Sequence, residues 1–139
     1  NFYNKKIKIF SFQDSLDKEV CTHFEGLLKS LNPNMQTEVV YNKTPEQLIE
    51  QMRSLQYMIA MRFHACLICA KYGVKTLALS YDYKVERLAE DLKLPYTNIK
   101  PDVNMDFFIN LMRNIDRGQL LTVVNSKEFD WSYLENLVK

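Results

Sequence analysis

Glycine is scarce in this chain of 139 residues, which contains only Gly26, Gly73 and Gly118. A dinucleotide-binding G-x-G-x-x-G turn and a phosphate-binding P-loop both need several closely spaced glycines, because the backbone must approach the ligand. These three glycines lie far apart. The sequence therefore argues against a dinucleotide cofactor and against a nucleoside triphosphatase.

Cysteine and histidine are also sparse, with three cysteines and two histidines. Cys66 and Cys69 have C-x-x-C spacing, but no second pair of ligands completes a zinc site, so we expect no metal. Both lie in an apolar, alanine-rich run that favours buried structural thiols. A thiol oxidoreductase built on this pair is an alternative. So few cysteines predict a reduced, intracellular protein.

Long apolar runs and a strong charge imbalance are missing as well. No run approaches the roughly 20 apolar residues of a membrane span, so we do not expect an integral membrane protein. The net charge of +1 gives no reason to expect nucleic acid as a partner. The sequence has no signal peptide. It begins with Asn1 rather than Met, so we expect a part of a longer protein.

The composition that remains is that of a globular domain, with 47% hydrophobic and 25% charged residues. The length favours one domain over residues 1–139. Apolar patterning predicts strands over 6–12, 35–41, 57–61, 74–80 and 95–99, and helices over 14–31, 45–55, 66–72, 84–92, 106–115 and 131–138. Residues 119–124 fit either a helix or a strand. The alternation predicts an α/β, Rossmann-like three-layer domain with a mostly parallel sheet.

The stretch from residue 57 to residue 84 is the centre of this pattern. An apolar strand, an alanine-rich helix that ends at Gly73 and a second apolar strand form a predicted βαβ unit with parallel strands. The helix over 106–115 is expected to bury Phe107, Ile109, Leu111, Met112 and Ile115.

Arg62 and His64 are polar residues within the apolar stretch, at the point where the first strand of this unit ends. Ligands of parallel sheets bind outside the carboxyl ends of the strands, where helix N-termini favour anions. A guanidinium and an imidazole there predict an anion site, and the imidazole can also move a proton. The alternative is that both residues only cap a helix and pair with carboxylates. His23 lies within a predicted helix and is expected at the surface.

Two further polar clusters follow strands of the predicted sheet. The second strand of the central unit is followed by Tyr81, Asp82, Tyr83 and Lys84, at the same edge as Arg62. Gln13 and Asp14 follow the first strand of the chain and are candidates for the same cleft. A helix cap is the alternative for Asp14.

At these residues the sequence resembles the polysaccharide pyruvyl transferase family. The resemblance rests on Ala60-Met61-Arg62-Phe63-His64-Ala65, on Tyr72-Gly73-Val74, and on Leu79-Ser80-Tyr81-Asp82-Tyr83-Lys84-Val85. The family has leucine where this chain has Phe63, and proline where it has Tyr83. The resemblance covers residues 57–85 strongly and the rest of the chain faintly.

The resemblance implies the C-terminal, Rossmann-like half of an enzyme with the GT-B arrangement. Such an enzyme transfers pyruvate from phosphoenolpyruvate to a sugar or lipid-linked saccharide acceptor as a ketal. It implies that His64 is catalytic and that Arg62, Phe63, Lys84 and Tyr81 bind substrate, without metal or cofactor. Acceptor binding would fall to a missing N-terminal domain.

The resemblance also implies a cellular location and a pathway class, and a second function remains as an alternative. It implies bacterial cell-surface polysaccharide synthesis in the cytoplasm, including the inner face of the membrane. The alternative is a non-catalytic module that binds an anion or a nucleotide sugar and acts only with a partner domain.

Overall fold

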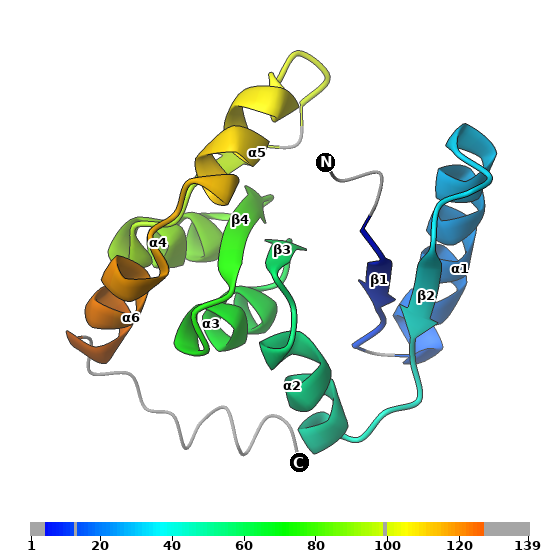
Figure 1. The fold of residues 1–139 in the computed structure, drawn as a ribbon, viewed down its shortest axis with the longest axis horizontal. Helices are drawn as coiled ribbons and strands as arrows, with labels where there is room; N and C mark the ends of the chain where they lie inside the picture. The colour runs from blue at the N-terminus through cyan, green and yellow to red at the C-terminus, as the bar shows by residue number, and fades with distance from the viewer. Residues whose placement is uncertain (1–4, 13, 99, 127–139) are drawn as a thin grey trace. The chain divides into compact units, whose positions relative to one another are not determined.

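The computed structural model describes residues 5–12, 14–98 and 100–126, and the chain divides into two compact units, residues 1–44 and 45–139. Each unit is described by itself (Figure 1). The expectation of one domain over the whole chain stays a prediction. The helix predicted over 131–138 lies outside the described residues.

The first unit is a strand–helix–strand element. It consists of β1 (Ile7–Phe10), α1 (Asp14–Leu31) and β2 (Thr37–Val40). The strands are parallel, and Ile7 pairs with Thr37 at one end of the register. The thiol of Cys21 donates to the carbonyl of Phe10 at 3.5 Å, and Thr37 Oγ1 donates to Glu25 at 2.8 Å. These two contacts hold α1 against the strands.

The second unit alternates helices and strands as the sequence predicts. Its elements are α2 (Pro45–Arg53), β3 (Tyr57–Ala60), α3 (Phe63–Lys71), β4 (Lys75–Ser80), α4 (Tyr83–Leu92), β5 (Tyr96–Asn98), α5 (Met105–Arg113) and α6 (Arg117–Ser126). Its sheet has the order β3-β4-β5, and both pairs are parallel. The ambiguous residues 119–124 lie in α6 and are helical. The α/β, Rossmann-like fold class is therefore confirmed.

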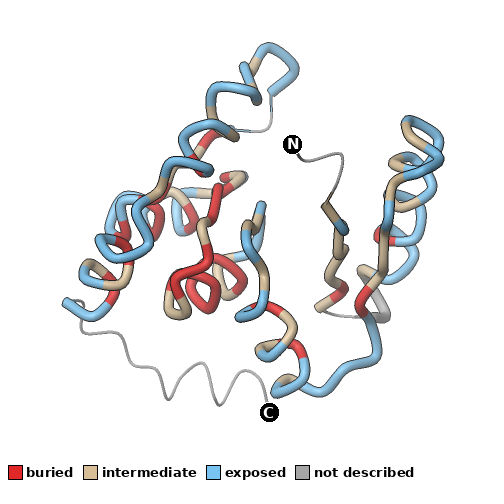
Figure 2. Tube along the Cα trace, in the orientation of Figure 1, coloured by how far each residue is buried: buried red, intermediate tan, exposed pale blue. Residues whose placement is uncertain are grey.

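The core of the second unit is centred on β4 and α3, where buried residues gather in Figure 2. Thr76, Leu77 and Ala78 are successive and all fully buried. Successive strand residues face opposite sides of a sheet, so both faces of β4 are covered. α3 and α4 contact each other and β4, and α5 also packs against β4. Small residues on α3, including Cys69 and Ala70, let that helix approach the strand closely.

The end of α3 depends on Gly73, as the sequence predicts. Gly73 has a positive φ of 73°, which glycine adopts at little cost. Val74 N then donates to Cys69 O at 2.9 Å, a helix-ending pattern. Arg117 Nη2 donates to Tyr72 O at 3.3 Å and lies over the glycine, so a Cβ there would stand 2.7 Å from Arg117 Nε.

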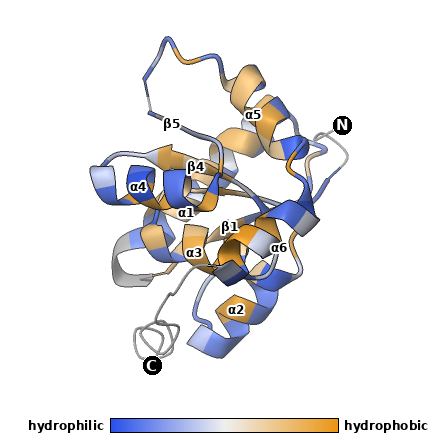
Figure 3. Ribbon diagram, turned by 90° about the vertical axis from the view of Figure 1, so that its left-hand side faces the viewer, coloured by the Kyte–Doolittle hydropathy of each residue, from blue (hydrophilic) through white to orange (hydrophobic). Residues whose placement is uncertain are grey.

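One prediction about α5 is wrong. Much of α5 is hydrophobic in the view of Figure 3, and Met112 is fully buried. Phe107 and Leu111 were expected to be buried with it, but they are 55% and 41% exposed. The two residues are four apart and share a different face from Met112. An apolar pattern that covers more than one face does not say which face meets the sheet.

Candidate active site

The five residues predicted to form a site lie at the carboxyl edge of the β3-β4-β5 sheet. β3 ends at Ala60 and continues into α3, whereas β4 ends at Ser80 and continues into α4. Because the strands are parallel, the two connections leave the sheet at the same edge. That edge carries Arg62, Phe63 and His64 on one connection, and Tyr81 and Lys84 on the next.

Within the described residues, the start of α3 has neither a side-chain cap hydrogen bond nor an acidic residue in its first turn. Arg62 is its N-cap residue, with an extended backbone (φ −94°, ψ 140°) and no side-chain cap hydrogen bond. The first turn contains no acidic residue. The first intrahelical bond runs from Cys66 N to Arg62 O at 3.1 Å, so no helix carbonyl serves the three N–H groups before Cys66. A partial positive charge therefore adds to the charge of Arg62.

The start of α4 is the opposite case. The Asp82 carboxylate accepts hydrogen bonds from Lys84 N at 2.9 Å and from Val85 N at 3.1 Å. Glu86 adds a second negative charge in the first turn. Two adjacent helices thus begin at one edge of the sheet, and only the α3 end suits a bound anion. The sequence reasoning missed Asp82 as a cap, although an Asp before an amphipathic helix is a recognisable signal.

His64 occupies the first turn of α3 and is half-buried. Its ring meets the ring of Phe63 edge-on, with centroids 5.5 Å apart and planes at 80°. Burial lowers the pKa of the imidazole below its ordinary value, because the charged form loses hydration. A neighbouring anion acts in the opposite sense and stabilises the imidazolium. A bound anion at this helix end would therefore raise the pKa of His64 relative to that in the free protein.

The second connection carries exposed side chains. Lys84 is exposed on the first turn of α4, while its backbone N–H is held by Asp82. Tyr81 and Tyr83 flank Asp82 and are 65% and 66% exposed. Tyr83 was expected in the cluster that follows the second strand, and it departs from the family pattern. The structure brings the predicted residues to one edge, and their roles in binding and catalysis stay predictions.

The two cysteines of the C-x-x-C pair are free and buried on α3. The Cys66 thiol lies 3.8 Å from the carbonyl of Ala60. Burial raises the pKa of both thiols to about 12, so both are protonated at neutral pH. A reactive cysteine needs the thiolate form, and these surroundings oppose it. The structural interpretation of the pair is thus the one that the structure favours.

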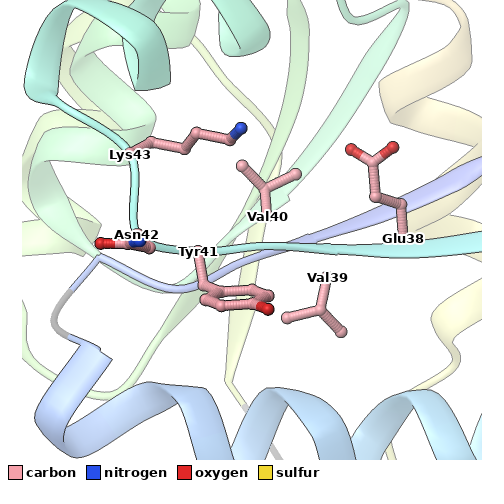
Figure 4. Close-up of a pocket in the computed structure, with 6 residues that line it drawn as sticks. All are labelled: Glu38, Val39, Val40, Tyr41, Asn42 and Lys43. Atoms are coloured by element: carbon pink, nitrogen blue, oxygen red, sulfur yellow. The ribbon is translucent and has the colours of Figure 1, made fainter.

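The first unit contains a hollow of about 440 Å³ along the end of β2. Its lining comes from one short stretch, Glu38 to Lys43. In Figure 4 the side chains of Glu38, Val40 and Lys43 lie on one side of the chain and those of Val39 and Tyr41 on the other. The Glu38 carboxylate pairs with Lys6 Nζ at 2.9 Å, which lowers its pKa. Among the described residues no second element lines this hollow, and we assign it no ligand. Gln13 and the side chain of Asp14 lie outside the described residues.

Clusters of metal-binding side chains and membrane-spanning helices are both absent from the part of the chain that the structure describes. No group of three or more His, Cys, Asp or Glu side chains there could hold a metal ion. None of the described helices is both long and apolar enough to cross a bilayer.

Comparisons with known proteins give one match. A family model described as polysaccharide pyruvyl transferase matches residues 1–83 of the 139-residue chain. The match spans β1 to β4, and it includes Arg62, Phe63, His64 and Tyr81 and ends one residue before Lys84. No curated protein and no solved structure matches the chain.

Proposed function

Because the chain belongs to the polysaccharide pyruvyl transferase family, we propose that it binds phosphoenolpyruvate at the start of α3 and transfers its pyruvyl group to a saccharide. In this proposal the chain is the donor-binding, C-terminal part of the enzyme. The acceptor is a sugar or a lipid-linked saccharide, handled in the cytoplasm or at the inner face of the membrane. No metal or organic cofactor takes part.

The observation that carries the proposal is the difference between the two helix starts. Phosphoenolpyruvate has a carboxylate and a phosphate, which need cations and N–H donors. The α3 end has no acidic residue and carries Arg62, whereas Asp82 and Glu86 already occupy the α4 end. Arg62 offers a planar fork to either acidic group of the donor. Phe63 covers one side of His64 and places its backbone against the donor, while Lys84 and Tyr81 approach from the α4 side.

His64 has the chemistry for the proton transfers. Ketal formation adds a proton to the methylene carbon of the donor, and two acceptor oxygens then bond to the adjacent carbon as its bond to the phosphate oxygen breaks. The two acceptor hydroxyls release two protons, of which one balances the new methyl group and the other leaves with phosphate. The imidazolium of His64 acts as the general acid, at the carbon or at the phosphate oxygen.

A donor titration tests the binding part of the proposal in the full-length protein. We expect Arg62→Ala to weaken phosphoenolpyruvate binding by about tenfold to a hundredfold, since a charge-assisted contact contributes roughly 1.5–3 kcal/mol. Arg62→Lys should recover only part of the affinity, because an ammonium cannot form the planar fork. The matched control is Arg87→Ala, which removes an exposed arginine from α4. Equal donor affinity in Arg62→Ala and wild type would refute the proposed site.

A further inference from the structure

Tyr81 and Tyr83 are two exposed aromatic residues on either side of Asp82, and the proposed donor site gives a role to Tyr81 but none to Tyr83. Each ring is about two-thirds exposed, at 65% and 66%. Among the described residues, neither hydroxyl makes a hydrogen bond and neither ring stacks on another ring or a cation. Large exposed aromatic surfaces at the edge of a candidate site commonly mark a binding surface.

The backbone between the two tyrosines turns their side chains to the same side. Asp82 has a fully extended conformation, with φ −144° and ψ 168°. Side chains on either side of an extended residue leave the chain in the same direction, and the middle one points away from them. The middle side chain is Asp82, which is turned to the N–H groups of α4. By this rule the Tyr81 and Tyr83 side chains leave the chain on the side opposite to that of Asp82.

This turn is also held in place before any ligand arrives. The Asp82 carboxylate caps α4, and its backbone carbonyl accepts a hydrogen bond from Ser80 Oγ at 2.7 Å. Ser80 is itself only 4% exposed, at the end of β4. Both sides of the Asp82 peptide are thus fixed to the strand and to the helix. The backbone that carries the two rings is therefore held in place, which lowers part of the entropic cost of binding.

We propose that Tyr81 and Tyr83 bind a pyranose ring of the saccharide acceptor, next to the donor site at the start of α3. A pyranose presents a face of C–H groups that packs on aromatic rings, and hydroxyls at its rim that suit phenol groups. The family match supplies the acceptor class, a saccharide. The inference rests on the proposed function, and it assigns part of acceptor recognition to this chain.

The test uses ligand-observed NMR on the full-length protein, with methyl glucopyranoside, methyl galactopyranoside and methyl mannopyranoside as probes, with and without phosphoenolpyruvate. We expect Tyr83→Ala and Tyr81→Ala each to weaken binding of at least one glycoside by about three- to tenfold. Tyr83→Phe keeps the ring and should stay within about twofold of wild type. Phe24→Ala, which removes an exposed ring from the middle of α1, is the matched control.

The outcomes separate this inference from the proposed function. Loss of glycoside binding in Tyr83→Ala with unchanged phosphoenolpyruvate affinity supports the inference. The inference is overturned if the double variant Tyr81→Ala, Tyr83→Ala binds the glycosides as tightly as the wild type does. It is also overturned if the wild-type protein with bound phosphoenolpyruvate binds none of the three glycosides. A lower melting temperature with full glycoside binding in Tyr83→Ala identifies a packing surface and also overturns it. Failure of the wild-type protein to bind phosphoenolpyruvate refutes the proposed function. The glycoside titration without the donor then still measures whether Tyr81 and Tyr83 bind a sugar.

Discussion

Replacing His64 by glutamine separates its contact role from its role as an acid. Glutamine keeps a hydrogen-bonding side chain in the first turn of α3 but cannot transfer a proton at any accessible pH. General acid catalysis contributes about a hundredfold to ten-thousandfold to a rate. We therefore expect kcat of ketal formation to fall by at least about a hundredfold, or roughly 2.7 kcal/mol of transition-state stabilisation. The Michaelis constant for phosphoenolpyruvate should change by less than about fivefold.

The pH profile makes this prediction sharper. Burial lowers the pKa of His64 in the free protein, and the anionic donor raises it in the complex. The acid role therefore predicts that kcat declines as pH rises through the pKa of the complex, and that His64→Gln lacks this limb. The assay is steady-state phosphate release with the donor varied, between about pH 5 and 9 around the ordinary pKa of histidine. His23→Gln, on an exposed position of α1, is the matched control. A His64→Gln enzyme with wild-type turnover would show that His64 is only a contact.

Four further predictions concern the fold around the site. Asp82→Ala should lower the free energy of unfolding of the second unit by about 0.5–2 kcal/mol in chemical denaturation, because two capping hydrogen bonds are lost, whereas Asp82→Asn keeps the acceptor and most of the stability. Gly73→Ala should lower the free energy of unfolding by about 1–2 kcal/mol, because φ at this position is positive. If the backbone and not the contact with Arg117 is responsible, the double variant Gly73→Ala, Arg117→Ala should keep most of this loss of stability. Cys66 and Cys69 should react with a thiol reagent at neutral pH only as fast as the second unit opens, and fast labelling in the native protein would contradict their burial. The pKa of His64 is lower in the folded protein than in the unfolded chain, so its contribution to the free energy of unfolding is fully present above about pH 6.5. This contribution is lost as the pH falls through the folded pKa, and the dependence should be absent in His64→Gln.

Much of the second unit is predictable from the sequence because its signals are local and agree with one another. The β-branched and apolar run before Ser80, the alanine-rich run before Gly73 and the proline at the start of α2 each match an observed boundary within about three residues. The helix or strand ambiguity of residues 119–124 could not be resolved, since a short apolar run fits both periods. The exposure of Phe107 and Leu111 was missed for a related reason, because packing partners and not periodicity select the buried face of α5.

The candidate site was predictable in position but not in detail. The order of strands and helices suffices to bring Arg62, His64 and Lys84 to one edge. The difference between the two helix starts depends on where each helix begins, and α3 begins three residues earlier than the sequence predicts. That shift makes Arg62 the N-cap and places His64 in the first turn. The shared direction of Tyr81 and Tyr83 depends on the backbone angles of Asp82, which no composition or periodicity reports.

The most direct test of the central claim is a crystal structure of the full-length protein with phosphoenolpyruvate bound. The account predicts donor density at the first turn of α3, with one acidic group on the N–H donors there, the Arg62 guanidinium on the same or the other acidic group, and the His64 ring beside the donor. Donor density at another edge of the sheet, or against the capped start of α4 with α3 empty, would contradict it.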